Sequence, residues 1–202
     1  MQRDLTTAAV AAVTAGACIV FALTLTQALF YAGEAEIPPE EILAATTTPA
    51  EQVPSGSLPA RLIIPVLEVD AAVQHVGINT AGNMAVPTNY QDVGWYRYGT
   101  VPGFLGSAVI DGHLDNGFGL DAVFKKLATL KTGDKIFIEA EDGTTLEFEV
   151  ERVEEYDVAE VPREQLFNSR DRARLNLVTC AGAWNSETKD YARRVVVYAV
   201  LV

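Results

Sequence analysis

The chain has 202 residues, 49% of them hydrophobic, which is enough for one domain with a proper core plus an appendage. Its formal net charge is -12, and the first 33 residues hold one arginine and one aspartate, so the remainder carries all of that charge. An acidic domain argues against nucleic-acid binding, which needs lysine and arginine to neutralise phosphates.

The N-terminal segment is free of charge over a long stretch. No Asp, Glu, Lys or Arg occurs from Leu5 to Gly33. At about 1.5 Å of rise per residue, a helix of that length exceeds the roughly 30 Å hydrocarbon core of a bilayer. We therefore expect residues 1–33 to form a short cytoplasmic tip and a transmembrane anchor. The rest of the chain would then be extracellular, in a single-pass protein of the cell membrane.

Two rival interpretations of this segment are a cleaved signal peptide and a lipoprotein signal at Cys18. The apolar part is long for a signal peptide, and the small triplet Ala15-Gly16-Ala17 falls in its middle. After Cys18 the apolar run simply continues through Ile19-Val20-Phe21. A retained anchor is the favoured interpretation.

Residues 34–57 differ in composition from what precedes and follows them. They contain Pro38-Pro39 and the run Thr46-Thr47-Thr48-Pro49, and they lack bulky apolar periodicity. This composition is typical of an extended spacer. A domain spanning residues 58–202 is predicted to follow it.

The domain consists of short β-branched or alternating runs separated by Gly, Pro, Asn and Asp, which are typical of strands. The expected strands are Arg61–Leu67, Ala71–Val76, a short one near Met84, Gly106–Gly112, Lys135–Ala140, Thr145–Tyr156, Arg174–Cys180 and Arg193–Val202. Helical patterning is confined to Leu120–Leu130 and a turn at Pro162–Phe167. The pattern predicts a mainly β fold, a closed antiparallel barrel of about eight strands with one or two short helices.

Cys180 is the only cysteine outside the N-terminal stretch, so no intrachain disulfide is expected. Strand alternation places Cys180 with Asn176 and Val178 on the more polar face of its strand. The same count places His113 on the face of Val109 and Asp111. Both groups are therefore predicted to end a strand on its wetter side.

A cysteine attacks as a thiolate, and a neighbouring imidazolium or guanidinium favours that charged form. The plain alternatives are a buried structural cysteine and a histidine that serves only a turn. His75 matches no catalytic pattern and is interpreted as structural. Since one cysteine and two distant histidines are a poor ligand set, we expect neither a metal nor a cofactor.

Three motifs in order resemble the sortases, membrane-anchored cysteine transpeptidases of mostly Gram-positive bacteria. They are Gly112-His113, Leu177-Val178-Thr179-Cys180, and Arg194 followed by Val195-Val196-Val197-Tyr198-Ala199. The segments Pro59–Pro65, Gly94-Trp95-Tyr96 and Pro102–His113 also look like that family. The resemblance runs from about Leu58 to Val202, which is essentially the whole domain.

The resemblance implies a reaction and a role for each residue. Cys180 would attack a backbone carbonyl in a C-terminal sorting signal of the LPXTG type, forming a thioacyl-enzyme that an amine resolves. His113 would be the general acid and base, and Arg194 would steady the substrate and the oxyanion. Thr179 is expected to offer its hydroxyl or backbone to the bound peptide. The implied partners are substrate proteins with such a signal and an amine of the cell wall or a pilin.

Spacing to the following apolar run favours Arg194 over Arg193, and Asp115 is a candidate to orient the imidazole, although a loop aspartate needs no function. The spacer lacks the Asp-Pro with which lids of pilin-polymerising sortases often begin, so a non-pilin class is expected. No acidic residue occurs from Tyr96 to Gly106, so calcium activation is not expected.

Two other functions fit parts of the pattern. A cell-wall L,D-transpeptidase also uses cysteine and histidine, but it usually shows a His-Gly-Cys cluster, whereas Thr179 and Ala181 flank Cys180 here. A membrane-tethered β-barrel that binds a partner without catalysis would leave Cys180 a passive thiol.

Overall fold

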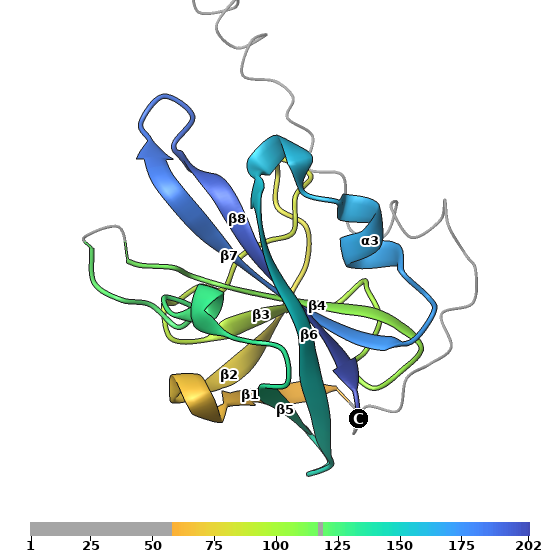
Figure 1. Ribbon diagram of the computed structural model, residues 1–202. Helices are drawn as coiled ribbons and strands as arrows, with labels where there is room; N and C mark the ends of the chain where they lie inside the picture. The colour runs from red at the N-terminus through yellow and green to blue at the C-terminus, as the bar shows by residue number, and fades with distance from the viewer. Residues whose placement is uncertain (1–57, 117–118) are drawn as a thin grey trace, which may run out of the picture. The chain divides into compact units, whose positions relative to one another are not determined.

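The computed structural model describes residues 58–116 and 119–202 (Figure 1). The predicted anchor in residues 1–33 and the spacer in residues 34–57 lie outside these described residues. Within them, no helix combines the length and the apolar character needed to cross a bilayer.

The described residues form eight strands that close into one barrel, in the order β1-β2-β3-β4-β7-β8-β6-β5. The strands are β1 (Pro59–Ile64), β2 (Val69–Val76), β3 (Val93–Tyr96), β4 (Gly106–Gly112), β5 (Lys135–Ala140), β6 (Thr145–Asp157), β7 (Ala173–Asn185) and β8 (Asp190–Leu201). The helical pieces are the 3-10 turns η3 (Pro65–Leu67), η4 (Leu127–Thr129) and η5 (Val158–Glu160) and the helix α3 (Arg163–Asn168). The mainly β closed barrel is confirmed.

The sequence predicts an antiparallel barrel, and this is wrong for two of the strand pairs. Strand β2 pairs with β3 in parallel, and β4 pairs with β7 in parallel. Parallel neighbours need a long crossover connection, and the chain between β4 and β7 supplies one that contains β5, β6 and α3. The strand expected near Met84 is only an isolated bridge between Ile78 and Met84.

The helix expected over Leu120–Leu130 is wrong, because only the three residues of η4 are helical there. The backbone N–H groups of Val123 and Phe124 donate to the carbonyls of Tyr90 and His113, so they are used in tertiary contacts. The apolar spacing instead reflects packing, since Phe124 is fully buried in the main core. The turn predicted at Pro162–Phe167 corresponds to α3.

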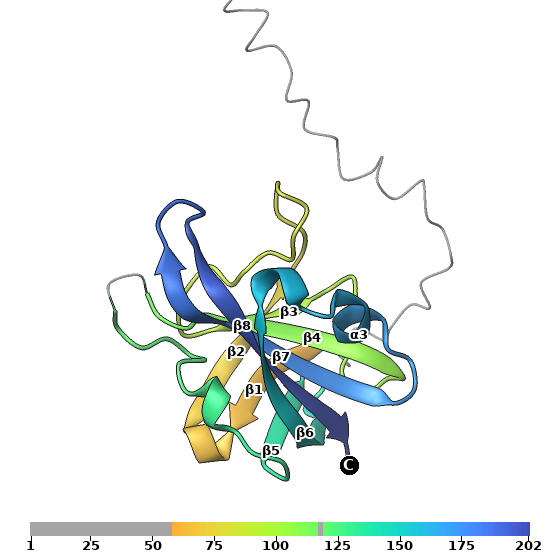
Figure 2. The same cartoon turned by 45° about the horizontal axis from the view of Figure 1, so that its top comes forward.

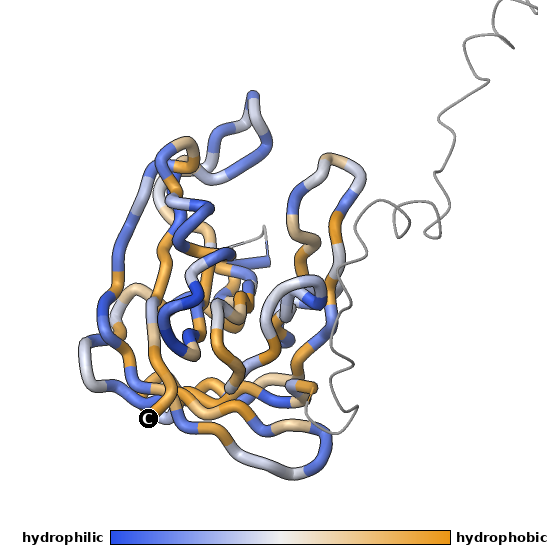
Figure 3. Tube along the Cα trace, turned by 90° about the vertical axis from the view of Figure 1, so that its right-hand side faces the viewer, coloured by the Kyte–Doolittle hydropathy of each residue, from blue (hydrophilic) through white to orange (hydrophobic). Residues whose placement is uncertain are grey.

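Alternation along the strands fills the barrel with aliphatic side chains. Leu175 and Leu177 of β7 and Val197 of β8 are fully buried in the main core cluster. Each such side chain contributes roughly 1.5–3 kcal/mol relative to exposure. Figure 3 shows hydrophobic residues running along the strands and hydrophilic residues concentrated in the connections.

A second, smaller core lies outside the barrel. Val109 of β4, Leu166 of α3, and Val196 and Tyr198 of β8 form it, all nearly or fully buried. The face predicted to be the wetter one is therefore covered along much of its length, and Asn176 on the same face is also fully buried. The sequence alternation was right, but it could not show that α3 packs on this face.

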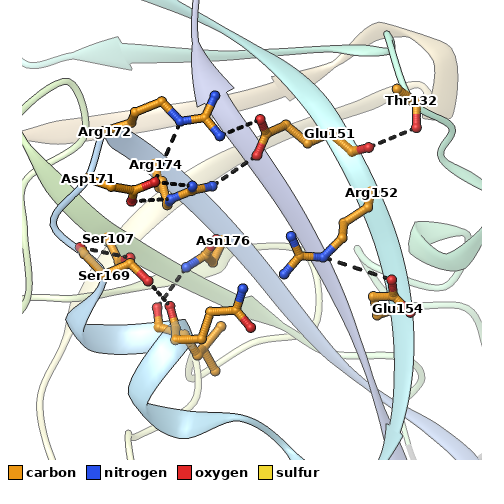
Figure 4. Close-up of polar contacts among 12 residues, drawn as sticks. Ser107, Thr132, Glu151, Arg152, Glu154, Ser169, Asp171, Arg172, Arg174 and Asn176 are labelled. Carbon is orange, nitrogen blue, oxygen red and sulfur yellow. Dashed lines mark hydrogen bonds and ion pairs between the residues drawn. The ribbon is translucent and has the colours of Figure 1, made fainter.

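Polar contacts fix α3 and the neighbouring strands (Figure 4). The side-chain amide of Asn176 donates to the Leu166 carbonyl of α3 at 2.7 Å. Arg174 of β7 forms an ion pair with Glu151 of β6 at 2.9 Å and another with Asp171. Since a buried amide needs a partner, the Asn176 contact ties the position of α3 to β7. Beyond α3, β7 and β8 run on together as a hairpin that Figure 2 shows projecting from the barrel.

Candidate active site

A groove of about 880 Å³ lies on the outer face of the barrel, with α3 forming part of its wall. Its lining comes from β3, β4, β7, β8, α3 and the connection between β2 and β3. His113, Cys180 and Arg194 all line it. The groove therefore collects the three side chains that the sequence analysis singled out.

Cys180 and Arg194 face each other across the antiparallel pair of β7 and β8, where they are direct register partners. Side chains in that relation start about 4.5–5.5 Å apart at their Cβ atoms. Arg193 instead forms ion pairs with Glu155 at 3.3 Å and Asp157 at 3.2 Å, both on β6. The register thus places Arg194, and not Arg193, beside the thiol.

His113 follows directly after β4, the other neighbour of β7. The parallel register of these strands pairs Asp111 with Val178, and extending it by two residues brings His113 level with Cys180. Adjacent strands lie about 4.7–4.9 Å apart. The histidine, cysteine and arginine therefore occupy one row across three adjacent strands, which we call the β4–β7–β8 row.

The imidazole of His113 is held by the connection between β2 and β3. Its Nε2 lies 3.0 Å from the carbonyl oxygen of Pro87. Because a carbonyl oxygen only accepts, Nε2 is the donor in this contact. The ring of Tyr90 packs against the imidazole with centroids 5.0 Å apart. Sequence reasoning missed both Pro87 and Tyr90, since neither carries a catalytic group.

The guanidinium of Arg194 is held by an ion pair in which one nitrogen contacts both oxygens of a carboxylate. Its Nη2 lies 2.7 and 2.8 Å from the two carboxylate oxygens of Asp190. Its Nη1 donates to the carbonyls of Tyr191 and Arg193 at 3.1 and 2.9 Å. The arginine is thus oriented at the groove, and Asp190 offsets part of its charge.

Partial burial raises the pKa of the Cys180 thiol, and this effect is larger than the lowering by Arg194. The negative charges of Asp190, of Asp115 and, when it is ionised, of Asp111 raise the same pKa further. The direction of the Arg194 effect is the one expected for a neighbouring cation, but burial outweighs it. Cys180 rests as a thiol at neutral pH, so attack requires that its proton be removed first.

Comparison with known proteins gives the family of the chain. The family model for the sortase domain matches residues 62–202. The chain belongs to the sortase family. Sortases are cysteine transpeptidases, so the family assignment favours that activity over an L,D-transpeptidase or a passive binding barrel. No curated protein matches the chain.

Solved sortase structures share the fold of this sortase. Sortase C-1 from Actinomyces oris is 23% identical, with 71% of each chain covered and a TM-score of 0.56. Sortase A from Corynebacterium diphtheriae is 23% identical, with 72% of this chain and 60% of that chain covered and a TM-score of 0.53. A lid mutant of the latter is 22% identical, with 85% and 82% covered and a TM-score of 0.57. The similar structures thus include both A-type and C-type enzymes.

Thr179 of this sortase is buried, and its hydroxyl donates to the carbonyl of Gly112 at 2.8 Å. This bond joins β7 to the last residue of β4, immediately before His113. The hydroxyl proton is therefore used within the protein, and the hydroxyl oxygen can still only accept from a bound peptide. Thr179 also lines the groove, next to Cys180.

Two further residues from the sequence analysis have structural partners. Asp115 accepts a hydrogen bond from the hydroxyl of Tyr191 at 2.6 Å, which links the loop after β4 to β8. His75 lies with its Nε2 2.9 Å from the carbonyl oxygen of Pro59 and its ring edge-on to Trp95. These contacts fit the structural interpretation of His75.

Within residues 58–116 and 119–202, no three His, Cys, Asp or Glu side chains gather as a metal site would need. A second hollow of about 500 Å³ lies beside Arg61 and Glu139 of β1 and β5. No thiol or imidazole lines it, so it offers no comparable chemistry.

Proposed function

We propose that this sortase is a membrane-anchored extracellular enzyme that cleaves a C-terminal LPXTG-like sorting signal and transfers the protein to a cell-surface amine. The observation that carries the proposal is the β4–β7–β8 row, which sets His113 and Arg194 on either side of Cys180 at one level of the groove. An uncharged stretch from Leu5 to Gly33 supports the anchor.

The chemistry follows from the row. His113 accepts the proton of Cys180, and the thiolate sulfur attacks the scissile carbonyl carbon. The carbonyl oxygen gains negative charge, and the guanidinium of Arg194 stabilises it at short range. Collapse breaks the carbon–nitrogen bond, and the departing amine takes the proton from His113. An incoming amine then attacks the thioester, loses a proton to His113, and releases Cys180, which regains its proton.

The ordinary resting contacts of the row must change during this cycle. His113 has to bring its Nδ1 within reach of the sulfur and the leaving nitrogen, because its Nε2 donates to the Pro87 carbonyl. Arg194 has to share its donors between Asp190 and the oxyanion. Apo geometry of catalytic groups is often looser than that of the complex, so these changes are compatible with the role.

The groove also fits a peptide with apolar side chains. Met84, Tyr96, Leu166 and Val178 line it, and the exposed side chain of Val86 stands at the same groove. Apolar walls with a few convergent polar groups are typical of ligand sites. We place the apolar residues of the sorting signal here and its scissile bond at Cys180.

The acceptor amine is proposed to belong to the cell wall or a pilin, and the enzyme to a non-pilin class. Support for the class is the absence of an Asp-Pro dipeptide from the sequence of residues 34–57. The amine must reach the thioester from the open side of the groove at Cys180.

The test is mass spectrometry of the full chain incubated with an LPXTG-containing peptide. The proposal expects an adduct whose mass equals the acyl part of the peptide, removed by hydroxylamine, in the wild type and not in Cys180→Ala. His113→Ala should also shift the pH profile of Cys180 alkylation, which a passive buried thiol would not show. Equal product release by Cys180→Ala would refute the proposal.

A further inference from the structure

The groove contains a carboxyl group that the proposed reaction does not use. Asp111 lies in β4, two residues before His113, and lines the groove. Its Oδ1 is buried and has no hydrogen-bond partner, a condition shared among the described residues only by Oδ1 of Asn176. An unsatisfied buried polar atom costs about 1–3 kcal/mol, so such an atom in a binding groove points to a missing partner.

The surrounding backbone leaves room for this carboxyl group. Gly94 of β3 is the register partner of Asp111. A Cβ at position 94 would lie 2.5 Å from Oδ1 of Asp111, so glycine is the residue that fits there. On the other side, Val178 of β7 is in register with Asp111. The carboxyl thus sits on the floor of the groove, between β3 and the strand that carries Cys180.

Apolar neighbours determine the protonation state of Asp111. Gly94, Val178 and the adjoining Val76 of β2 carry no charge, and burial raises the pKa of Asp111 to about 8. The other titratable or charged groups that line the groove are Tyr96, Tyr98, His113, Arg163, Arg170, Cys180, Asp190 and Arg194. At pH 7 Asp111 is therefore mostly a neutral acid, with one O–H donor and one free acceptor.

We propose that Asp111 is a specificity-determining subsite that binds an amide group of the sorting signal as a neutral carboxylic acid. The inference rests on the proposed function. On binding, the side chain turns its carboxyl group toward the groove, the acid O–H donates to the amide carbonyl, and the amide N–H donates to the second carboxyl oxygen, so both groups are satisfied and no charge forms. A peptide that presents an amide at this point is bound better than one that presents an aliphatic group.

The pairing also explains why a neutral acid suits this position. An ionised Asp111 would have no donor for a peptide carbonyl. Its charge would also raise the pKa of Cys180 further, because the two groups interact electrostatically. Ionisation of Asp111 should therefore weaken binding of the peptide and attack on it together.

The experiment measures kcat/KM for cleavage of an LPXTG-containing peptide between pH 6 and 9. We expect Asp111→Leu, similar in size but without hydrogen bonds, to lose about tenfold at pH 7, chiefly through KM. Asp111→Asn keeps a donor and an acceptor and should lose about threefold. The ratio of Asp111→Asn to wild type should rise about tenfold from pH 7 to 9, since only the wild type ionises. Asp142→Asn, in an exposed hairpin, is the matched control and should leave the ratio flat.

Each of the other possible results overturns either this inference alone or the proposed function together with it. Normal thioacyl formation in the wild type with no loss in Asp111→Leu, or a flat ratio for Asp111→Asn, overturns this inference alone. Adduct formation that is intact in Asp111→Asn while transfer to the amine is lost would assign the carboxyl to the amine, and also overturns it. A wild type that forms no adduct with any signal peptide overturns the proposed function and this inference together. If Asp111→Leu does not fold, the pH-dependent ratio of Asp111→Asn decides.

Discussion

The bond between Thr179 and Gly112 predicts that stability and catalysis are coupled at one buried hydroxyl. The Thr179 hydroxyl donates to the Gly112 carbonyl at 2.8 Å, and the side chain is almost fully buried. Thr179→Val keeps the shape of the side chain but removes the donor. The Gly112 carbonyl is then left without this partner, at the point where β4 leads into His113.

The expected cost follows from leaving a buried acceptor unpaired, which is about 1–3 kcal/mol. With a urea dependence of roughly 1–3 kcal/mol per molar, the unfolding midpoint should fall by about 1 M. The end of β4 should also loosen, so that His113 is displaced relative to Cys180. Misplacement of a catalytic group on the ångström scale can cost about 100-fold in rate, so we expect a loss of at least tenfold in thioacyl formation.

The assay combines urea unfolding of the full chain with the rate of adduct formation. Thr179→Ser, which keeps the hydroxyl, should restore most of the rate. Thr132→Val removes a comparable bond to the Glu151 carbonyl at an exposed position and should change stability by less than about 0.5 kcal/mol. A Thr179→Val variant with unchanged midpoint and unchanged rate would refute the coupling between this bond and the site.

Two further predictions concern the same strand ends. Asp190→Asn should lower the pKa of Cys180, because the negative charge of Asp190 raises it. The pH profile of iodoacetamide alkylation should therefore move to lower pH. A shift to higher pH would contradict this effect of Asp190 on the thiol. Gly112→Ala should lower the free energy of unfolding by about 1–3 kcal/mol, because a Cβ there would lie 2.5 Å from the ring of Phe124. Thermal unfolding measures this change. An unchanged midpoint would show that the Phe124 ring moves aside without cost.

The sequence predicted the parts of the fold that depend on local alternation. The runs at Gly106–Gly112, Lys135–Ala140 and Thr145–Tyr156 are strands with nearly the expected bounds. The inward and outward faces of β7 also follow the alternation, with Leu177 buried in the barrel and Cys180 only partly buried on the other face. Period-two patterning is a property of neighbouring residues, so a single sequence reveals it.

What the sequence could not supply depends on contacts between distant segments. The parallel pairing of β4 with β7 sets His113 level with Cys180, and no local pattern encodes it. The apolar spacing around Phe124 resembles that of a helix, but it reflects burial of a side chain in the main core. The raised pKa of Cys180 likewise reflects burial, which outweighs the guanidinium that the motif suggested.

Interactions with loops were also beyond the sequence. The sequence does contain a signal for Asp190, an acidic residue four positions before Arg194, and these two residues form the ion pair. The hydrogen bond from His113 to the Pro87 carbonyl has no such signal in the sequence, because a main-chain carbonyl is present at every residue. The orphaned oxygen of Asp111 needed the burial of its surroundings to be recognised.

If the β4–β7–β8 row works as one unit, the two adjacent arginines should differ sharply in their effect on catalysis. In a single-turnover measurement with an LPXTG-containing peptide, Arg194→Ala should slow thioacyl formation on Cys180 by about 100- to 1,000-fold. Arg193→Ala, which removes only exposed ion pairs with Glu155 and Asp157, should stay within about twofold of the wild type. Equal losses in both variants, or a larger loss at Arg193, would show that Arg194 does not act with Cys180 and His113 as a unit.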